Sequence, residues 1–185
     1  MKLLLHICCA PCSIMCIETL RGEGIEPVGF WDNPNIHPFT EFRMRRNTLV
    51  DYAKEIGLSL VVEGGYGLRP FLEAVGGDFD GRCPVCYRLR MRSAARYAAE
   101  NGFTHFTTTL LISPYQNHEL LAQTAREAAQ EFGVSFLYRD FRPSFREGQD
   151  RARAMGLYMQ KYCGCIFSEE DRYRKRKKPP KKEEV

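Results

Sequence analysis

The start of this 185-residue chain lacks the long apolar segment that a membrane anchor or a secretory signal requires. The opening MKLLLHICCAPC holds one lysine and a short apolar run that ends at cysteines and a proline, which is too short for a signal-peptide core or a bilayer span. We therefore expect a soluble, cytoplasmic protein with no membrane partner. The length is that of one domain, and the 44% hydrophobic content is enough for an ordinary core.

A phosphate-binding loop is also missing near the N-terminus. Nucleotide-using α/β enzymes place a loop rich in glycine and serine after the first strand, where backbone amides hold phosphate. The first predicted strand here covers residues 2 to 7, and residues 8 to 12 read CCAPC instead. A nucleotide site at this position is therefore disfavoured.

Cysteine, by contrast, is abundant, with eight residues. In a reducing compartment disulfides give no structural benefit and exposed thiols are open to oxidation, so metal ligation or redox chemistry is the favoured explanation. A free cysteine can also be a small buried hydrophobe, which is our interpretation of Cys16. The others include three close pairs: Cys8 and Cys9, Cys83 and Cys86, and Cys163 and Cys165.

Positive charge is concentrated in residues 172 to 185, RYRKRKKPPKKEEV, which hold eight Lys/Arg and two Glu, or +6. Removing these from the totals of 27 basic and 23 acidic residues leaves 19 and 21, or −2. We expect one catalytic domain over residues 1 to 170 and a disordered basic tail over 171 to 185. The tail either binds nucleic-acid phosphates in a salt-sensitive manner or only improves solubility.

Strand patterns alternate with helix patterns along the chain, which predicts an α/β fold: an open parallel sheet with helices on both faces. Pro27 weakens the second strand or places it near an edge. Such sheets bind ligands beyond the carboxyl ends of their strands, where strand order reverses, and Cys8 follows the first strand. The predicted strands are 2 to 7, 25 to 31, 58 to 63, 105 to 112 and 134 to 141, and the predicted helices are 11 to 22, 39 to 56, 68 to 75, 83 to 101, 114 to 132 and 145 to 161.

Four of the cysteines suit one iron–sulfur cluster. Cys83 and Cys86 stand at the start of a predicted helix, where backbone amides and the helix dipole favour thiolates. Such a C-x-x-C pair is a metal-ligand pair, a thioredoxin-like dithiol or a coincidence. Adjacent Cys8 and Cys9 do not suit a zinc knuckle, but the two pairs together meet the four-thiolate requirement of a [4Fe–4S] cluster. Spacing leaves other combinations of four open.

The other cysteines allow a redox role. Cys163 and Cys165 flank Gly164, which tolerates the bend that direct pairing requires. A C-x-C disulfide is geometrically restricted and labile, which suits electron transfer; metal ligation is the competing interpretation. Cys12 lies one helical turn before Cys16 and nearer the strand end. It is a candidate for an additional ligand or a catalytic thiol.

Few other side chains carry a distinct signal. His37 lies in the loop segment NPNIHP, and loops on an α/β scaffold often supply function, although a histidine making local hydrogen bonds is an equal interpretation. We interpret His6, inside a strand, as structural. Tyr115 and the arginine-rich segment 43 to 46 could stack on a base and bind phosphate, but an arginine row on a helix is often only a solvated face.

Six separated motifs occur in order from residue 3 to about 170. They are HICCAPC at 6 to 12, NPNIHP at 33 to 38 followed by EFRMR at 41 to 45, RCPVCYRLR at 82 to 90, FTTTLLISPYQ at 106 to 116, DFRP at 140 to 143 and GLYMQKYCGCIFS at 156 to 168. Together they resemble the cobalamin-independent epoxyqueuosine reductases of the QueH family. No single motif is specific, but six in order make a chance similarity improbable.

The resemblance implies a Rossmann-like fold of the HUP type and an oxidoreductase that converts epoxyqueuosine at the wobble position of tRNA to queuosine. It implies a [4Fe–4S] cluster, a nearby mononuclear iron and a separate electron donor. Cys163 and Cys165 become a redox-active pair, and Cys12 is the candidate ligand for the second iron. Met159 stands where we expect an arginine or a similar residue. Carried over residue by residue, the cluster ligands are Cys8, Cys9, Cys83 and Cys86.

Removing the epoxide oxygen needs two electrons and two protons and releases water. A low-potential cluster could deliver electrons singly, and an iron acting as a Lewis acid could take the departing oxygen. The Cys163/Cys165 dithiol supplies or stores the electron pair, and Asp32 and His37 are candidate acids. Two alternatives remain open: an ATP-dependent tRNA-modifying thiolase of related fold, and a zinc-stabilised RNA-binding module whose cysteines only hold the fold.

Overall fold

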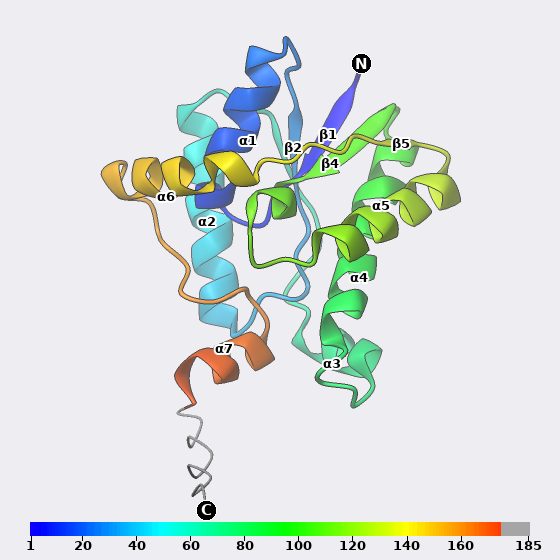
Figure 1. The fold of residues 1–185 in the computed structure, drawn as a ribbon, viewed down its shortest axis with the longest axis vertical. Coiled ribbons are helices and arrows are strands. Elements are labelled where there is room, and N and C mark those ends of the chain that lie inside the picture. Colours follow the sequence, from blue (N-terminus) through cyan, green and yellow to red (C-terminus); the bar gives the residue numbers. More distant parts are fainter. Residues whose placement is uncertain (175–185) are drawn as a thin grey trace, which may run out of the picture.

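Five short parallel strands form one sheet in the order β3-β2-β1-β4-β5 (Figure 1). The computed structural model describes residues 1–174 of the chain. Strand order reverses between β1 and β4, since β2 and β3 extend the sheet on one side and β5 on the other. The strands are β1 (Leu3–His6), β2 (Val28–Trp31), β3 (Leu60–Val62), β4 (His105–Thr108) and β5 (Ser135–Phe136).

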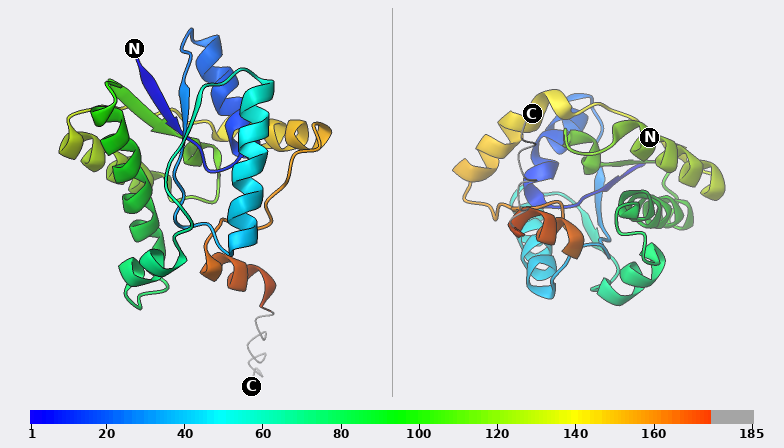
Figure 2. Two further views of the ribbon diagram at one scale, coloured as in Figure 1. Left: turned by 180° about the vertical axis from the view of Figure 1, so that it is seen from behind. Right: turned by 60° about the horizontal axis from the view of Figure 1, so that its bottom comes forward.

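Helices cover both faces of this sheet, which confirms the predicted α/β class (Figures 1 and 2). One face carries α1 (Ala10–Gly22), α2 (Phe39–Glu55) and α6 (Phe145–Ala154). The other carries α3 (Leu68–Val75), α4 (Arg82–Glu100) and α5 (His118–Phe132). The last helix, α7 (Ile166–Tyr173), lies at the carboxyl-end side of the sheet, below α2 in Figure 1.

The central strand β1 is buried on both faces, and its sequence LLLH is correspondingly apolar almost throughout. Small residues bring the helices of the second face together. Helices α4 and α5 pack on each other, and both carry buried alanines, such as Ala95 and Ala125. Long buried side chains in the sheet and alanines on the helices form the main core, and a second, smaller cluster contains Phe71, Val75 and Cys165.

The chain leaves β4 earlier than the sequence predicts. The predicted strand 105 to 112 ends at Thr108, whose side chain accepts a hydrogen bond from the Leu110 amide at 3.2 Å. This bond starts the 3₁₀ helix η1 (Thr109–Ile112) and turns the backbone away from the sheet. The helix predicted from residue 114 begins instead at His118, because the Asn117 side chain caps it through the Leu120 amide.

Other boundaries also differ from the prediction. β2 is an interior strand, and Pro27 lies just before it rather than in its ladder. The predicted strand 134 to 141 pairs over two residues only. The predicted helix 145 to 161 ends at Ala154, since Gly156 takes a left-handed φ of 67° and the Leu157 amide folds back onto the Ala152 carbonyl.

α7 runs to Tyr173, past residue 170, and most of the predicted basic tail, 171 to 185, lies outside the described residues. Among residues 1–174, no helix combines the length and apolar character needed to span a bilayer.

Candidate active site

Three thiols meet at the carboxyl end of β1, where strand order reverses. Cys8 and Cys9 follow this strand and Cys12 lies in the first turn of α1, which Pro11 opens. The three sulfur atoms lie within 4.8 Å of one another, and all three residues are buried. We call them the inner cysteines. Cys16, one turn further, is a buried thiol that donates to the Cys12 carbonyl at 3.3 Å and stays outside this group.

The inner cysteines differ in their readiness to lose a proton. The pKa of Cys8 is lowered because the thiols of Cys12 and Cys9 donate hydrogen bonds to its sulfur, with further help from Arg90 and Thr109. The pKa of Cys12 is raised because it makes that donation, and burial raises the pKa of Cys9. Cys8 is therefore the first of the three to become a thiolate.

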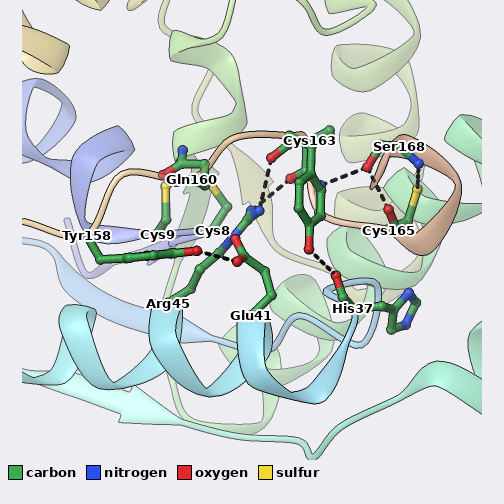
Figure 3. A network of polar contacts seen from close by, with 12 residues as sticks. Cys8, Cys9, His37, Glu41, Arg45, Tyr158, Gln160, Cys163, Cys165 and Ser168 are labelled. Carbon is green, nitrogen blue, oxygen red and sulfur yellow. Dashed lines mark hydrogen bonds and ion pairs between the residues drawn. The ribbon is translucent and has the colours of Figure 1, made fainter. Parts of the chain in front are cut away.

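Gln160 covers the inner cysteines from the loop before α7 (Figure 3). Its Nε2 atom donates to Cys9 Sγ at 3.0 Å and to Cys12 Sγ at 3.4 Å. Its Oε1 atom is buried and has no hydrogen-bond partner among residues 1–174. The amide is thus fixed over the sulfurs while one polar atom stays available to a bound group.

A buried arginine stands between the two cysteine-bearing regions. Arg90 is 2% exposed and donates to Asn33 Oδ1 at 2.7 Å, to His6 Nε2 at 3.4 Å and, more weakly, to Cys86 Sγ at 3.9 Å. Within residues 1–174 it has no carboxylate partner. Its charge therefore acts on the sulfurs of Cys8 and Cys86.

His6 serves as a neutral acceptor for this arginine. Its Nδ1 atom lies 2.9 Å from Thr108 Oγ1, so that nitrogen carries the proton and Nε2 accepts from Arg90. Burial, followed by the Arg90 charge, lowers the pKa of His6 to about 3. The position agrees with a structural histidine.

The remaining four cysteines lie around the start of α4 and the loop before α7, and we call Cys83, Cys86, Cys163 and Cys165 the outer cysteines. Cys83 and Cys163 are exposed, Cys86 is partly buried, Cys165 is buried, and all four thiols are free. Burial raises the pKa of Cys86 to about 12. Tyr87 donates to Gln116 Oε1 at 2.7 Å, which turns the Gln116 Nε2 atom toward Cys163 Sγ at 3.4 Å.

The loop that carries Cys163 and Cys165 is held against α2 by hydrogen bonds (Figure 3). Arg45 donates to the carbonyls of Tyr162 and Cys163, each at 2.9 Å, and pairs with Glu41 at 2.7 Å. Tyr158 donates to the same carboxylate. Gly164 has φ 155°, and a Cβ there would lie 3.3 Å from Asn35 and 3.4 Å from Arg45, so the bend of the C-G-C segment requires glycine.

The two candidate acids have other roles. His37 Nε2 donates to the Pro34 carbonyl at 3.0 Å, and its Nδ1 accepts from the Ile166 amide at 3.3 Å. Asp32 accepts from the Ser93 hydroxyl at 2.5 Å. His37 therefore makes local hydrogen bonds that hold the loop, and neither residue lines the cavity beside the inner cysteines.

That cavity has a volume of about 640 Å³. Cys8, Cys12 and Cys163 all open onto it, so both cysteine groups share one space. Four basic residues and no acidic residue contribute to its lining, namely Arg45, Arg153, Lys161 and Arg172. The volume is in the range of small-molecule sites, and the basic lining favours an anionic ligand.

A family model described as epoxyqueuosine reductase QueH matches residues 3–171. The chain belongs to this family. An epoxyqueuosine reductase QueH from Dehalococcoides mccartyi is 36% identical over 178 residues, covering 96% of this chain and 98% of that protein. Its QueH relative from Thermotoga maritima is 32% identical, covering 89% and 88% of the two chains.

A solved structure extends the comparison to the fold. The predicted subunit of a tRNA methyltransferase from Methanocaldococcus jannaschii matches with a TM-score of 0.50 and 10% identity, over 83% of this chain and 88% of that one. At this identity the likeness concerns the fold alone. The sequence motifs, rather than the fold, identify the QueH family.

The resemblance names Cys8 and Cys9 as cluster ligands, and the geometry places them with Cys12 in one group that could hold a metal ion. The ligand role of Cys8 and Cys9 stays a prediction. The roles of Cys83 and Cys86 as ligands, and of Cys163 and Cys165 as a redox pair, stay predictions. Sequence reasoning does not single out Arg90 or Gln160. Arg90 could have been found from its position one helical turn after Cys86, but nothing in the sequence predicts that Gln160 reaches the inner cysteines.

Proposed function

We propose that this protein is an epoxyqueuosine reductase that removes the epoxide oxygen of epoxyqueuosine at the wobble position of tRNA, giving queuosine. Membership of the QueH family supports the reaction. The observation that carries the proposal is that the sulfurs of Cys8 and Cys12 open onto a basic cavity of about 640 Å³ at the reversal of strand order. Because its substrate is tRNA, we place the enzyme in the cytoplasm, with a separate electron donor.

The donor set suits iron in sulfur coordination. Three buried thiols lie within 4.8 Å of one another, and soft thiolates favour iron–sulfur clusters. Two guanidinium groups, from Arg45 and Arg90, supply positive charge to compensate thiolates. We infer that Cys8, Cys9, Cys83 and Cys86 hold a [4Fe–4S] cluster, and that Cys12 serves an additional mononuclear iron.

The reaction consumes two electrons and two protons, forms the alkene and releases water. When bound, iron–sulfur groups held by these cysteines would supply electrons singly and a Lewis acid for oxygen. Cys163 lies in the cavity wall and Cys165 two residues on is buried. Oxidation of this dithiol to a disulfide releases two electrons and two protons, which balances the reaction.

Other residues of this chain prepare the site. Arg45 holds the Cys163 backbone, and Gln116 orients its sulfur. Gln160 closes the space over Cys9 and Cys12, which excludes water from that side of the sulfurs. The positively charged lining attracts the phosphates that flank the modified nucleoside.

Anaerobic reconstitution with iron and sulfide, followed by an assay on tRNA bearing epoxyqueuosine, tests the proposal. We expect queuosine without ATP consumption, no product from Cys8→Ala, and near-normal product from the control Cys16→Ala. The Cys16 control is matched because it removes a buried thiol one turn from Cys12. A colourless zinc protein that binds RNA without turnover would favour the zinc-stabilised module, and a requirement for ATP would favour the thiolase.

A further inference from the structure

One wall of the cavity is a single face of α6. Phe145, Gln149 and Arg153 stand at successive turns of this helix, and all three line the cavity. The adjacent face of α6 packs on α1 through Gly148 and Ala152. Since a Cβ at Gly148 would lie 3.1 Å from Met15 Cγ, the small residues hold α6 close to α1 and turn the lining residues toward the cavity.

Tyr115 extends this wall from the loop between η1 and α5. Its side chain is 85% exposed, the largest exposure among the large hydrophobic residues of the described chain. The ring meets Phe145 edge to face, with centroids 5.9 Å apart and planes at 84°. An edge-on neighbour supports the ring without covering both of its faces, so a flat face stays open to a stacking partner.

Positive charge follows the rim of the same cavity. Lys161 and Arg172 are exposed lining residues that form no ion pair within residues 1–174. Among the described residues, the ion-pair partner of Arg153 is Asp150, its exposed neighbour on α6, at 2.6 Å. A second cavity of about 650 Å³ beside α4 differs, because Asp32 and Glu131 are among its lining residues. An aromatic face and unpaired cations therefore occur together at the first cavity.

We propose that this wall binds the RNA strand on either side of the reacting nucleoside, with Tyr115 stacking on a neighbouring base and Lys161 and Arg172 holding its phosphates. Stacked bases with cations along the backbone are the usual arrangement for single-stranded nucleic acid. The inference rests on the proposed function and specifies which surface reads the RNA.

The test measures binding and turnover separately in the reconstituted protein. Binding uses a fluorescent anticodon stem-loop without the modification, and turnover compares an epoxyqueuosine-bearing stem-loop with free epoxyqueuosine nucleoside. We expect Tyr115→Ala to raise Kd and KM about tenfold or more with kcat nearly unchanged, since one stacked base is lost. Tyr115→Phe keeps the aromatic ring and should bind the stem-loop with the Kd of the wild-type protein. Tyr138→Ala, an exposed tyrosine away from the cavity, is the matched control.

Charge removal gives a second readout. Lys161→Gln and Arg172→Gln should each lower the slope of log K against log salt by about 0.7, the value for one phosphate contact on a single strand. Arg88→Gln, an exposed arginine at the second cavity, should leave the slope unchanged. The inference would be overturned if Arg88→Gln and Lys161→Gln lowered the salt slope equally, or if Tyr115→Ala changed neither Kd nor KM. Wild-type turnover would still support the reductase in either case. If the wild-type protein gave no product, the proposed reductase function would be wrong, and the Kd values alone would decide whether this wall binds RNA.

Discussion

The inner and outer cysteines share one cavity but are held in different ways. Cys8, Cys9 and Cys12 are buried at the end of the central strand and the start of α1, where the sheet fixes the backbone. The outer cysteines lie at the start of α4 and in a loop whose position depends on Arg45 and Gly164. Two of their four thiols are exposed.

This difference suggests a division of work. A buried, rigid sulfur group can keep a metal in one geometry through repeated cycles. A C-G-C segment with one thiol in the cavity can exchange electrons with a reductant that approaches from solvent. Arg90 lies between the regions and acts electrostatically on both, so the two groups are neighbours without being equivalent.

The largest expected effect on turnover comes from the exposed thiol of Cys163. Cys163→Ser should abolish multiple turnover, because the dithiol can no longer form a disulfide, while iron and sulfide content stays at the wild-type level. Product per enzyme and metal content, measured on the same sample, check this. Wild-type turnover by the variant would show that the C-G-C segment is not the electron store.

Removing the charge between the two regions should have the next largest effect. Arg90→Met takes away a buried positive charge that favours the reduced, more negative site, so the reduction potential should become more negative, on the order of 100 mV at an effective dielectric of about 20. Redox titration of the reconstituted protein measures it.

Two variants control the Arg90 experiment. Arg90→Lys keeps the charge and should shift the potential less, whereas Arg88→Met removes an exposed arginine of the same helix and should shift it little. An unchanged reduction potential in Arg90→Met would mean that Arg90 has only a structural role, through packing and hydrogen bonds.

A smaller effect is expected at the inner group. Gln160→Leu removes the hydrogen bonds to Cys9 and Cys12 at similar volume and should lower metal affinity about 10- to 100-fold, the usual cost of losing a partner of metal ligands. Competition with an iron chelator measures this. Gln149→Leu, in the same cavity wall but without a sulfur contact, should keep the wild-type affinity.

The sequence predicts the α/β class and the position of Cys8 and Cys9, because continuous apolar strands and helical periodicity are local patterns. It predicts less well where the chain leaves the sheet at Thr108, since that turn depends on a side-chain hydrogen bond to Leu110. The role of Gln160 depends on a loop that Arg45 holds from more than a hundred residues away. Long-range contacts of this kind leave no periodic signal in the sequence.

The most direct test of the account is the iron and sulfide content of Cys83→Ala beside Cys163→Ala after identical anaerobic reconstitution. If the cluster spans the inner cysteines and the start of α4, Cys83→Ala loses the iron–sulfur absorbance and most of its sulfide, whereas Cys163→Ala keeps both. Full iron and sulfide in both variants would contradict this ligand assignment and leave the inner cysteines to hold the metal without Cys83.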